Sequence, residues 1–217
     1  MGREVNEVDS IKGVSLVYVL GPRNKKRIAE LKAYGAMVIM TVSRSVVSWQ
    51  RGLSPFYLGP VKLYGGHTAR NVENAWQFCK VYKSHLGPDG NPSPEYFAWA
   101  KKGWGDTKAH RYPMGKGAVP EYSWWDGEKL EYVQARKKIY APLYIKAVAG
   151  TDSWKRLKHE YEANSDIVLW DFDAYDHRAF SMTYKDVLNE QKRKMGHAFI
   201  LAMLLECKDE VVGMLEG

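Results

Sequence analysis

Three polar residues in one short segment have the types and the spacing of a catalytic set. Glu73, Gln77 and Lys80 stand at positions i, i+4 and i+7, which on a helix places them along one side over two turns. A carboxyl group can protonate a leaving nitrogen. A partly desolvated lysine has a lowered pKa and can attack a sugar carbonyl carbon as a free amine. The same spacing is also typical of a polar, solvated helix face that carries no chemistry.

The element that must position these residues is predicted to be an amphipathic helix from Asn71, a typical N-cap residue, to Ser84. Other stretches also favour helices by their periodicity, and short apolar runs favour strands. The expected helices lie at 25–34, 95–102, 128–148, 153–163 and 184–215, and the expected strands at 15–20, 37–42 and 167–170. We therefore expect a mainly α, compact single-domain fold with a small β element near the N-terminus, where strand, helix and strand could form a parallel pair.

The composition excludes several classes of protein. The chain has 217 residues, of which 45% are hydrophobic and 26% charged, values of a folded protein rather than a disordered one. Cys79 and Cys207 lie far apart, which excludes a thiolate zinc site and a disulfide framework. The chain has neither an apolar run of about 18 residues nor an apolar segment in its first ten positions. We expect a cytoplasmic protein with no membrane partner, and no feature specifies an oligomeric state.

The charge balance favours an anionic partner. The formal net charge is +7 and the pI is about 9.2, which suits nucleic acid, nucleotides or a phosphate-bearing substrate. The basic segment at 108–117 and the tryptophans around it would suit a nucleic-acid groove. Those tryptophans are Trp104, Trp124 and Trp125. A solvated charge run on a packed loop is the alternative interpretation.

Four segments occur in an order that resembles a known family. The first segment is the turn Leu53–Phe56, which is followed about twenty residues later by Glu73, Trp76, Gln77 and Lys80. ARKKIYAPLY at 135–144, NSDIVLWDFD at 164–173 and the step at 195–197 then follow. Together they resemble the NADAR family, the N-glycosidases of NAD and ADP-ribose metabolism. Arg193 and Lys194 stand where the family usually has an asparagine before the last step.

The resemblance implies a domain organisation and a reaction. A NADAR-like helical domain would span 38–217 with an insertion at about 86–127, and residues 1–37 would be an N-terminal extension packed on it. Lys80 would attack the anomeric carbon of an opened ribose and form a Schiff base, and Glu73 would act as general acid and then general base. The reaction would remove ADP-ribose, or a ribose phosphate, from a base, here guanine in nucleic acid. Another branch of the family hydrolyses riboflavin intermediates, and no metal or cofactor is needed.

Further residues are expected to bind the substrate. By resemblance, Trp76 would shield the amine and Gln77 would orient a ribose hydroxyl. Arginine forks suit phosphate oxygens, which makes Arg44 and Arg136 candidates for the diphosphate. The remaining substrate-binding candidates are Ser54, Phe56, Trp170, Asp171 and Asp173.

Two other functions remain open from the sequence. The run from Ile167 to Asp173 also has the pattern of an apolar strand ending in DxD, which metal-dependent phosphatases and glycosyltransferases use. Tyr175 stands where the phosphatase pattern has Thr or Val. The chain could also be a non-catalytic module that binds ADP-ribose or nucleic acid through its basic and aromatic residues.

Overall fold

The computed structural model describes residues 15–163 and 166–216 of the chain. Helices take up 46% and strands 14%, and the strands form three small sheets. The expectation of a mainly helical fold is therefore wrong, and the protein is mixed α and β. The strands that the sequence did not predict have only two to four residues, too few for the alternation that identifies a strand in a sequence.

The first sheet combines two strands from the N-terminal part of the chain with one strand from residues 167–170. Its strands are β1 (Val17–Leu20), β8 (Ile167–Trp170) and β2 (Met37–Met40), in that order. β1 and β2 each run parallel to β8. The predicted strands near the N-terminus therefore exist, but they do not pair with each other, because β8 lies between them.

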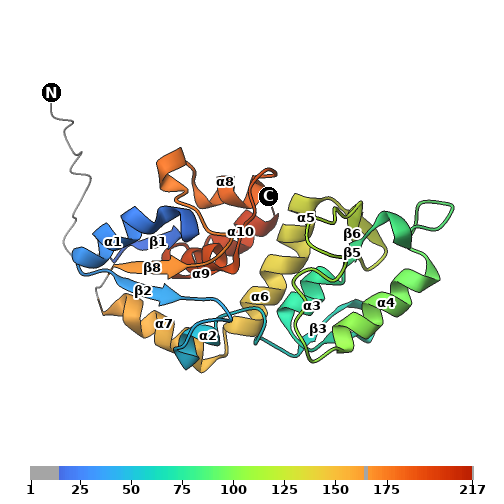
Figure 1. Ribbon diagram of the computed structural model, residues 1–217, viewed down its shortest axis with the longest axis horizontal. Coiled ribbons are helices and arrows are strands. Elements are labelled where there is room, and N and C mark those ends of the chain that lie inside the picture. The colour runs from blue at the N-terminus through green and yellow to red at the C-terminus, as the bar shows by residue number, and fades with distance from the viewer. Residues whose placement is uncertain (1–14, 164–165, 217) are drawn as a thin grey trace.

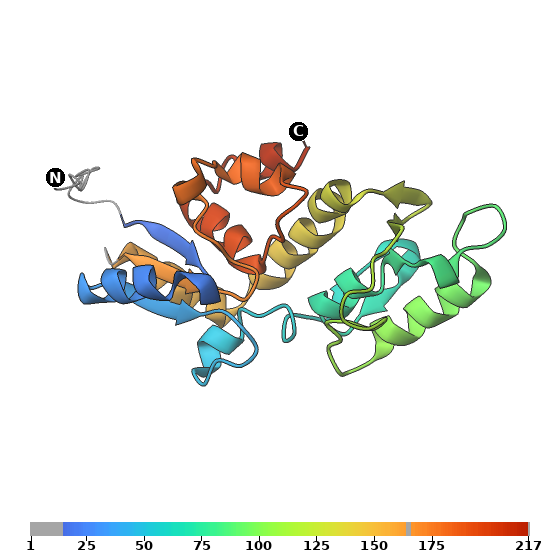
Figure 2. The same ribbon diagram turned by 45° about the horizontal axis from the view of Figure 1, so that its top comes forward.

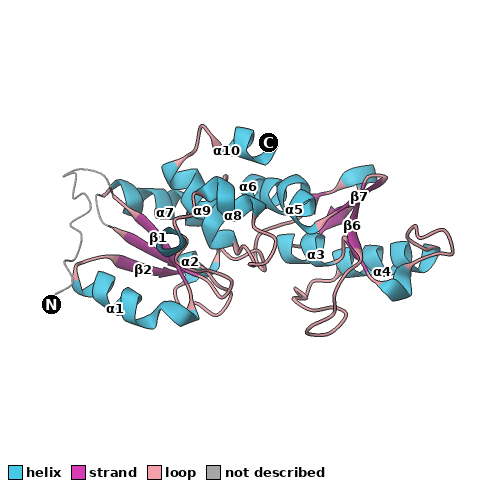
Figure 3. Cartoon of the chain, turned by 90° about the horizontal axis from the view of Figure 1, so that it is seen from above, coloured by secondary structure: helices cyan, strands magenta, loops and turns pink. Residues whose placement is uncertain are grey.

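Helices cover both faces of this sheet (Figure 3). On one face, Leu20 and Val168 pack with Leu31 of α1 (Lys25–Ala33). On the other face, Val19 and Leu169 belong to the main core, which includes the buried apolar residues of α9 (His197–Glu206). β8 is apolar along its length because it is paired on both edges and covered on both faces.

The second group of strands lies at the opposite end of the molecule (Figures 1 and 2). β3 (Val61–Lys62) and β4 (Thr68–Ala69) form one antiparallel pair. An antiparallel sheet is made of β5 (Lys80–Val81), β6 (Tyr122–Trp125) and β7 (Glu128–Leu130). Helix α4 (Pro94–Gly105) begins with Ser93, whose hydroxyl accepts from the main-chain N–H of Tyr96.

One long helical segment runs between these two ends (Figure 1). It consists of α5 (Tyr132–Ala135), a π-helical turn from Arg136 to Tyr140, and α6 (Ala141–Val148). Pro142 stands at the start of α6, and a proline has no N–H for a bond to the preceding turn, which accounts for the local change of winding. The predicted helix at 128–148 therefore begins later, because residues 128–130 form β7.

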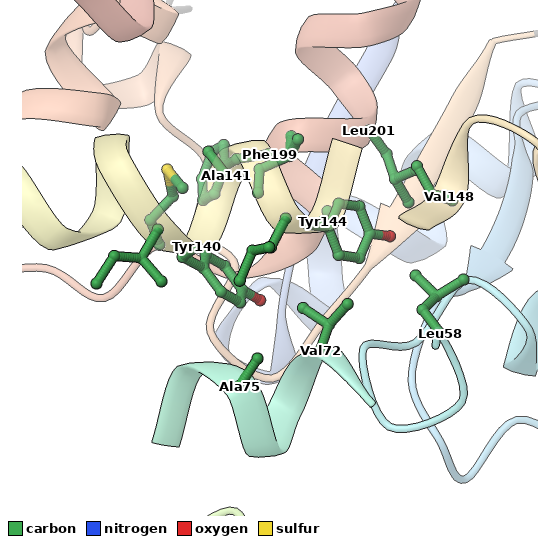
Figure 4. Packing of buried hydrophobic residues seen from close by; sticks show 14 of the residues in the cluster. Leu58, Val72, Ala75, Tyr140, Ala141, Tyr144, Val148, Phe199 and Leu201 are labelled. Atoms are coloured by element: carbon green, nitrogen blue, oxygen red, sulfur yellow. The ribbon is translucent and has the colours of Figure 1, made fainter. Parts of the chain in front are cut away.

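The core forms where α6 contacts its neighbours. Figure 4 shows Tyr140 and Tyr144 beside Val72 and Ala75 of α3 (Val72–Gln77), with Phe199 nearby. The hydroxyl of Tyr144 donates to the carbonyl of Leu53 at 2.6 Å. Burial of these large side chains is the main force that holds α3 against α6.

The C-terminal part of the chain differs from its prediction as one helix from 184 to 215. The structure has α8 (Tyr184–Asn189), α9, and α10 (Val211–Glu216). Gly196 is the extended N-cap residue of α9, so it starts a helix instead of lying inside one. The remaining helices are α2 (Ser48–Arg51) and α7 (Asp152–Glu162).

Both the expected N-terminal extension and the expected insertion contain helices and strands of the fold. Residues 15–37, from the expected extension, supply β1 and α1 to the parallel sheet, and residues 1–14 lie outside the described part. The expected insertion at 86–127 contains α4, a long loop and β6. In the described residues, no helix combines the length and the apolarity that crossing a bilayer requires.

Candidate functional site

Helix α3 is fixed by the turn that precedes it. The main-chain N–H of Glu73 donates to the carbonyl of Pro55 at 3.0 Å, and that of Val72 donates to Leu58 at 2.8 Å. Asn71 caps the helix by accepting from the N–H of Asn74. These bonds satisfy three N–H groups at the helix start that have no partner within the helix, so they fix the orientation of Glu73.

The helix ends earlier than its sequence pattern predicts. It stops at Gln77, and Lys80 begins β5, where it pairs with Ser123. The carbonyl of Cys79 accepts from the N–H of Trp124 at 2.7 Å and from the hydroxyl of Tyr96 at 3.1 Å. Because strand β6 and a core tyrosine use this carbonyl, the chain leaves the helix there. Glu73, Gln77 and Lys80 thus do not share one helix.

The three residues nevertheless form one connected network. Nζ of Lys80 donates to Oε1 of Gln77 at 2.7 Å, and Nε2 of Gln77 donates to Oε1 of Glu73 at 3.0 Å. Glu73 is only 5% exposed. The amide of Gln77 therefore stands between the carboxyl group and the amine, and it bonds to both.

Burial changes the acid–base properties of both ends of this network. It raises the pKa of Glu73 to about 7, and the Gln77 hydrogen bond and the charges of Lys80 and Arg111 oppose the rise only in part. Burial also lowers the pKa of Lys80; the charges of Cys79 and Glu73 oppose this shift, and the charge of Lys194 adds to it. A carboxyl group that titrates near neutral pH beside an amine of lowered pKa is suited to proton transfer and nucleophilic attack.

An aromatic ring lies beside the amine, and a second ring packs on the first. Nζ of Lys80 lies 4.7 Å from the ring centroid of Trp76, and this ring lies 5.2 Å from that of Tyr140. Tyr140 is buried, and burial raises the pKa of its hydroxyl well above 10, with a further rise from the charge of Glu73.

The loop after β8 places a second carboxylate, that of Asp173, near Glu73 and Lys80. Asp173 accepts from Nη2 of Arg111 at 2.9 Å. The charge of Asp173 acts on the pKa values of both Glu73 and Lys80. Asp173 and Arg111 are each about one third exposed, so this pair forms the side of the site that solvent reaches.

Asp171 takes a different role from Asp173. It is 4% exposed, and its Oδ2 lies 3.2 Å from Nδ1 of His197. Nε2 of His197 bonds to the carbonyl of Thr41 at 2.7 Å. Asp171 therefore links the end of β8 to α9, and its carboxylate and that of Asp173 have separate partners.

This separation reduces the support for a DxD metal site. The described residues contain no group of three or more His, Cys, Asp or Glu side chains that could hold a metal ion. Of the two carboxylates in the motif, Asp171 is buried and contacts His197, whereas Asp173 is paired with Arg111.

Arg44 reaches the same loop from the neighbouring strand. It follows β2 and lies with its guanidinium carbon 5.8 Å from the ring centroid of Phe172. Trp170 packs edge-on against the same ring at 4.9 Å. β2 and β8 are parallel, so their carboxyl ends meet at one edge of the sheet, where ligands bind in open α/β sheets.

Arg136 lies apart from this surface and has a structural role. It is 1% exposed. Its guanidinium donates to the carbonyls of Val187, Leu188 and Arg193 at 2.8–3.1 Å, and lies over the ring of Tyr132. These contacts use both terminal nitrogens of Arg136 to hold α8 and the loop after it, so Arg136 is not a candidate for binding phosphate.

Ser54 and Phe56 lie in the turn that supports α3. Ser54 is buried, and its hydroxyl accepts from the N–H of Phe56 at 3.4 Å. Phe56 is half-buried. This turn positions Glu73 through a main-chain hydrogen bond, which the N–H of Glu73 donates to the carbonyl of Pro55.

Three residues around the Glu73–Lys80 network were not predicted as site residues from the sequence. Arg111 lies in the basic loop that was linked only to nucleic acid. Lys194 was noted only as a departure from the family pattern. Tyr140 lies within a motif but has no charge to single it out. Their sequence signals were too general, and only the fold brings loop, strand end and helix together.

A large apolar groove lies elsewhere, between α6, α7, α9 and α10. Its volume is about 970 Å³, and residues that line it include Ile145, Trp154 and Leu204. None of its described lining residues belongs to the Glu73–Lys80 network. The candidate site instead joins the buried Glu73–Lys80 network to the partly exposed pair of Arg111 and Asp173.

Comparison with known proteins places the chain in a family. Residues 23–183 match the family described as a family of unknown function (DUF6939). The chain belongs to this family. The part that matches DUF6939 includes Glu73, Lys80, Arg111 and Asp173. The DUF6939 description states no activity, and no curated protein matches the sequence.

Proposed function

We propose that this protein is a hydrolytic N-glycosidase that cleaves the bond between a ribose phosphate moiety and a base. The observation that carries the proposal is the network of Glu73, Gln77 and Lys80, which joins a buried carboxyl group to a desolvated amine. The resemblance to NADAR enzymes supports the same assignment of roles, because these residues fall in the register of that family.

The reaction follows from the two ends of the network. When the ribose ring opens, C1 becomes an imine of the base nitrogen. Nζ of Lys80 adds to C1 and one of its protons passes to the base nitrogen; Glu73 gives that nitrogen a second proton, and the C1–base bond breaks. The products are the free base amine and a protonated Schiff base between C1 and Nζ. Water then adds to C1, Glu73 accepts a proton from it, and the C1–Nζ bond breaks to release the sugar and restore the amine.

The surroundings of the network favour an anionic substrate. Arg44, Arg111 and Lys194 lie around the Asp173 loop and the amine of Lys80. Such an excess of positive charge draws phosphate groups toward the site. ADP-ribose carried on guanine in nucleic acid is the substrate we favour, since the whole chain has a net charge of +7. We also expect the protein to act in the cytoplasm, where its free cysteines stay reduced.

Borohydride trapping tests the proposal. The protein is incubated with DNA that carries ADP-ribose on guanine, sodium borohydride is added, and the protein is weighed by mass spectrometry. We expect a ribosyl adduct on Lys80 in the native protein, and no adduct in Lys80→Ala. Lys83→Ala is the matched control, because Lys83 is exposed and lies three residues away, and it should still form the adduct.

A second variant separates catalysis from binding. Glu73→Gln should retain ADP-ribose binding and lose at least 100-fold in rate, in the range of lost general acid catalysis. Release of ADP-ribose without an adduct would remove Lys80 as the nucleophile. Binding of ADP-ribose with neither adduct nor release would instead identify a non-catalytic binding module.

A further inference from the structure

The loop that carries Arg111 is attached to helix α3 by one buried side chain. Nδ2 of Asn74 donates to the carbonyls of Asp106 and Lys108 at 3.0 and 2.9 Å, and its Oδ1 accepts from the N–H of His110 at 2.9 Å. Asn74 is fully buried and directly follows Glu73. Three hydrogen bonds to one stretch of main chain fix the position of this loop relative to the general acid.

Arg111 extends from this loop to a ring that it shares with a second arginine. Its guanidinium carbon lies 5.5 Å from the ring centroid of Phe172, and that of Arg44 lies 5.8 Å from the same centroid. Phe172 is 38% exposed. The two guanidinium groups come from separate parts of the chain and meet at one solvent-accessible ring.

The ion pair between Arg111 and Asp173 is weak enough for a phosphate group to replace the carboxylate. Its bond to Asp173 involves two side chains that are each about one third exposed. An ion pair of this exposure contributes roughly 1 kcal/mol or less. A phosphate group offers a guanidinium two parallel bonds to charged oxygens, which is a stronger interaction.

We propose that Arg44 and Arg111 form a binding site for the phosphate group of the substrate, with Asn74 as the residue that positions Arg111. On binding, Arg111 exchanges the carboxylate of Asp173 for phosphate oxygens. Asp173 is then free to accept a hydrogen bond from the ribose. The identity of the ligand as a sugar phosphate rests on the proposed function, whereas the phosphate site itself does not require catalysis.

Calorimetric titration with inorganic pyrophosphate and with ADP-ribose tests this site. Arg111→Gln should weaken binding of both by about 10- to 100-fold, the loss expected for a charge-assisted pair. Asp173→Asn should act in the opposite direction on pyrophosphate and tighten its binding by about two- to fivefold, because Arg111 no longer has to leave a carboxylate. Arg156→Gln in α7 is the matched control, and should leave both affinities unchanged.

The positioning role of Asn74 is tested by a double-mutant cycle. Asn74→Ala should weaken pyrophosphate binding, but Asn74→Ala combined with Arg111→Gln should bind as Arg111→Gln alone does. A merely structural role would add the effect of Asn74→Ala on affinity to that of Arg111→Gln, because the two losses would then be independent. If Asn74→Ala does not fold, the opposite effects of Arg111→Gln and Asp173→Asn still decide whether the phosphate site exists.

The outcomes separate this inference from the proposed glycosidase. Equal affinities of the native protein and Arg111→Gln would overturn the phosphate site, as would the absence of pyrophosphate and ADP-ribose binding. Binding that depends on Arg111 without a Schiff base on Lys80 would support the site and remove the glycosidase. A Schiff base that forms equally well in Arg111→Gln, with unchanged affinity, would retain the enzyme and remove the site.

Discussion

Glu73 and Lys80 are connected through a single side-chain amide, that of Gln77, which donates to the carboxyl group at 3.0 Å and accepts from the amine at 2.7 Å. The amide keeps the two groups close without a direct bond between them. A proton on the carboxyl group and a neutral amine are the forms that the proposed first step needs. The network is therefore a testable unit, independent of the substrate.

Replacement of the amide should alter the titration of Glu73. In Gln77→Leu, the carboxylate loses a hydrogen bond that lowers its pKa, so the pKa of Glu73 should rise above its value of about 7. The measurement is the titration of the Glu73 side-chain carbon by NMR. Gln191→Leu, at an exposed position, is the control, and a pKa of Glu73 that stays the same in Gln77→Leu would contradict the network.

The buried carboxyl group should make the protein less stable as the pH rises. The pKa of Glu73 is about 7 in the folded protein, against 4.5 for an ordinary glutamate, so the folded state binds more protons between these values. The stability that protonated Glu73 contributes to the folded state is fully present below pH 4.5. It declines as the pH rises to 7 and is absent above that value. The loss is about 3 kcal/mol.

Urea unfolding of Glu73→Gln checks this dependence. The amide does not titrate, so the variant should gain about 3 kcal/mol relative to the native protein between pH 4.5 and pH 7.5. Using the difference between the two proteins cancels the effects of other titrating groups. Parallel stability curves for the two proteins would show that Glu73 titrates at its usual value.

A glycine at the start of α9 should be intolerant of a side chain. A Cβ atom at position 196 would overlap the carboxylate of Asp171, which is itself held by His197. Gly196→Ala should therefore lower the free energy of unfolding by about 2 kcal/mol, as overpacking does. Gly105→Ala, where a Cβ would meet no atom within 4 Å, is the control in the same thermal unfolding measurement.

Removal of the clashing carboxylate should restore part of this stability. The double variant Asp171→Ala with Gly196→Ala should lose less free energy of unfolding than the two single changes add up to. Strict additivity of the single changes would show that the two residues do not compete for the same space.

Arg136 should affect stability and leave ligand affinity unchanged. Arg136→Met leaves three carbonyl groups without their charged donor, so the free energy of unfolding should fall by about 3 kcal/mol. Arg136→Lys should lose less, since it keeps the charge. Pyrophosphate titration below the unfolding temperature checks affinity, and a loss of affinity in the folded variant would return Arg136 to the phosphate site.

The sequence was sufficient for the elements that follow from local patterns. The strands at 17–20, 37–40 and 167–170 and the helices at 25–33 and 152–162 lie where periodicity and flanking glycines indicate them. Residue type and spacing singled out Glu73, Gln77 and Lys80, and the family resemblance then favoured them as a catalytic set. These signals are local, because they reflect how a short segment folds its own backbone and presents one face.

Tertiary structure decided how these elements combine. β8 enters between β1 and β2, two pairings that join residues about 150 and about 130 positions apart and leave no local pattern. The helix that starts at Val72 ends at Gln77 because Trp124 and Tyr96 bond to the carbonyl of Cys79. Arg111 reaches Asp173 because Asn74 holds its loop. In each case the deciding hydrogen bond joins distant segments, so the sequence determined the chemical groups and the folded chain determined which of them meet.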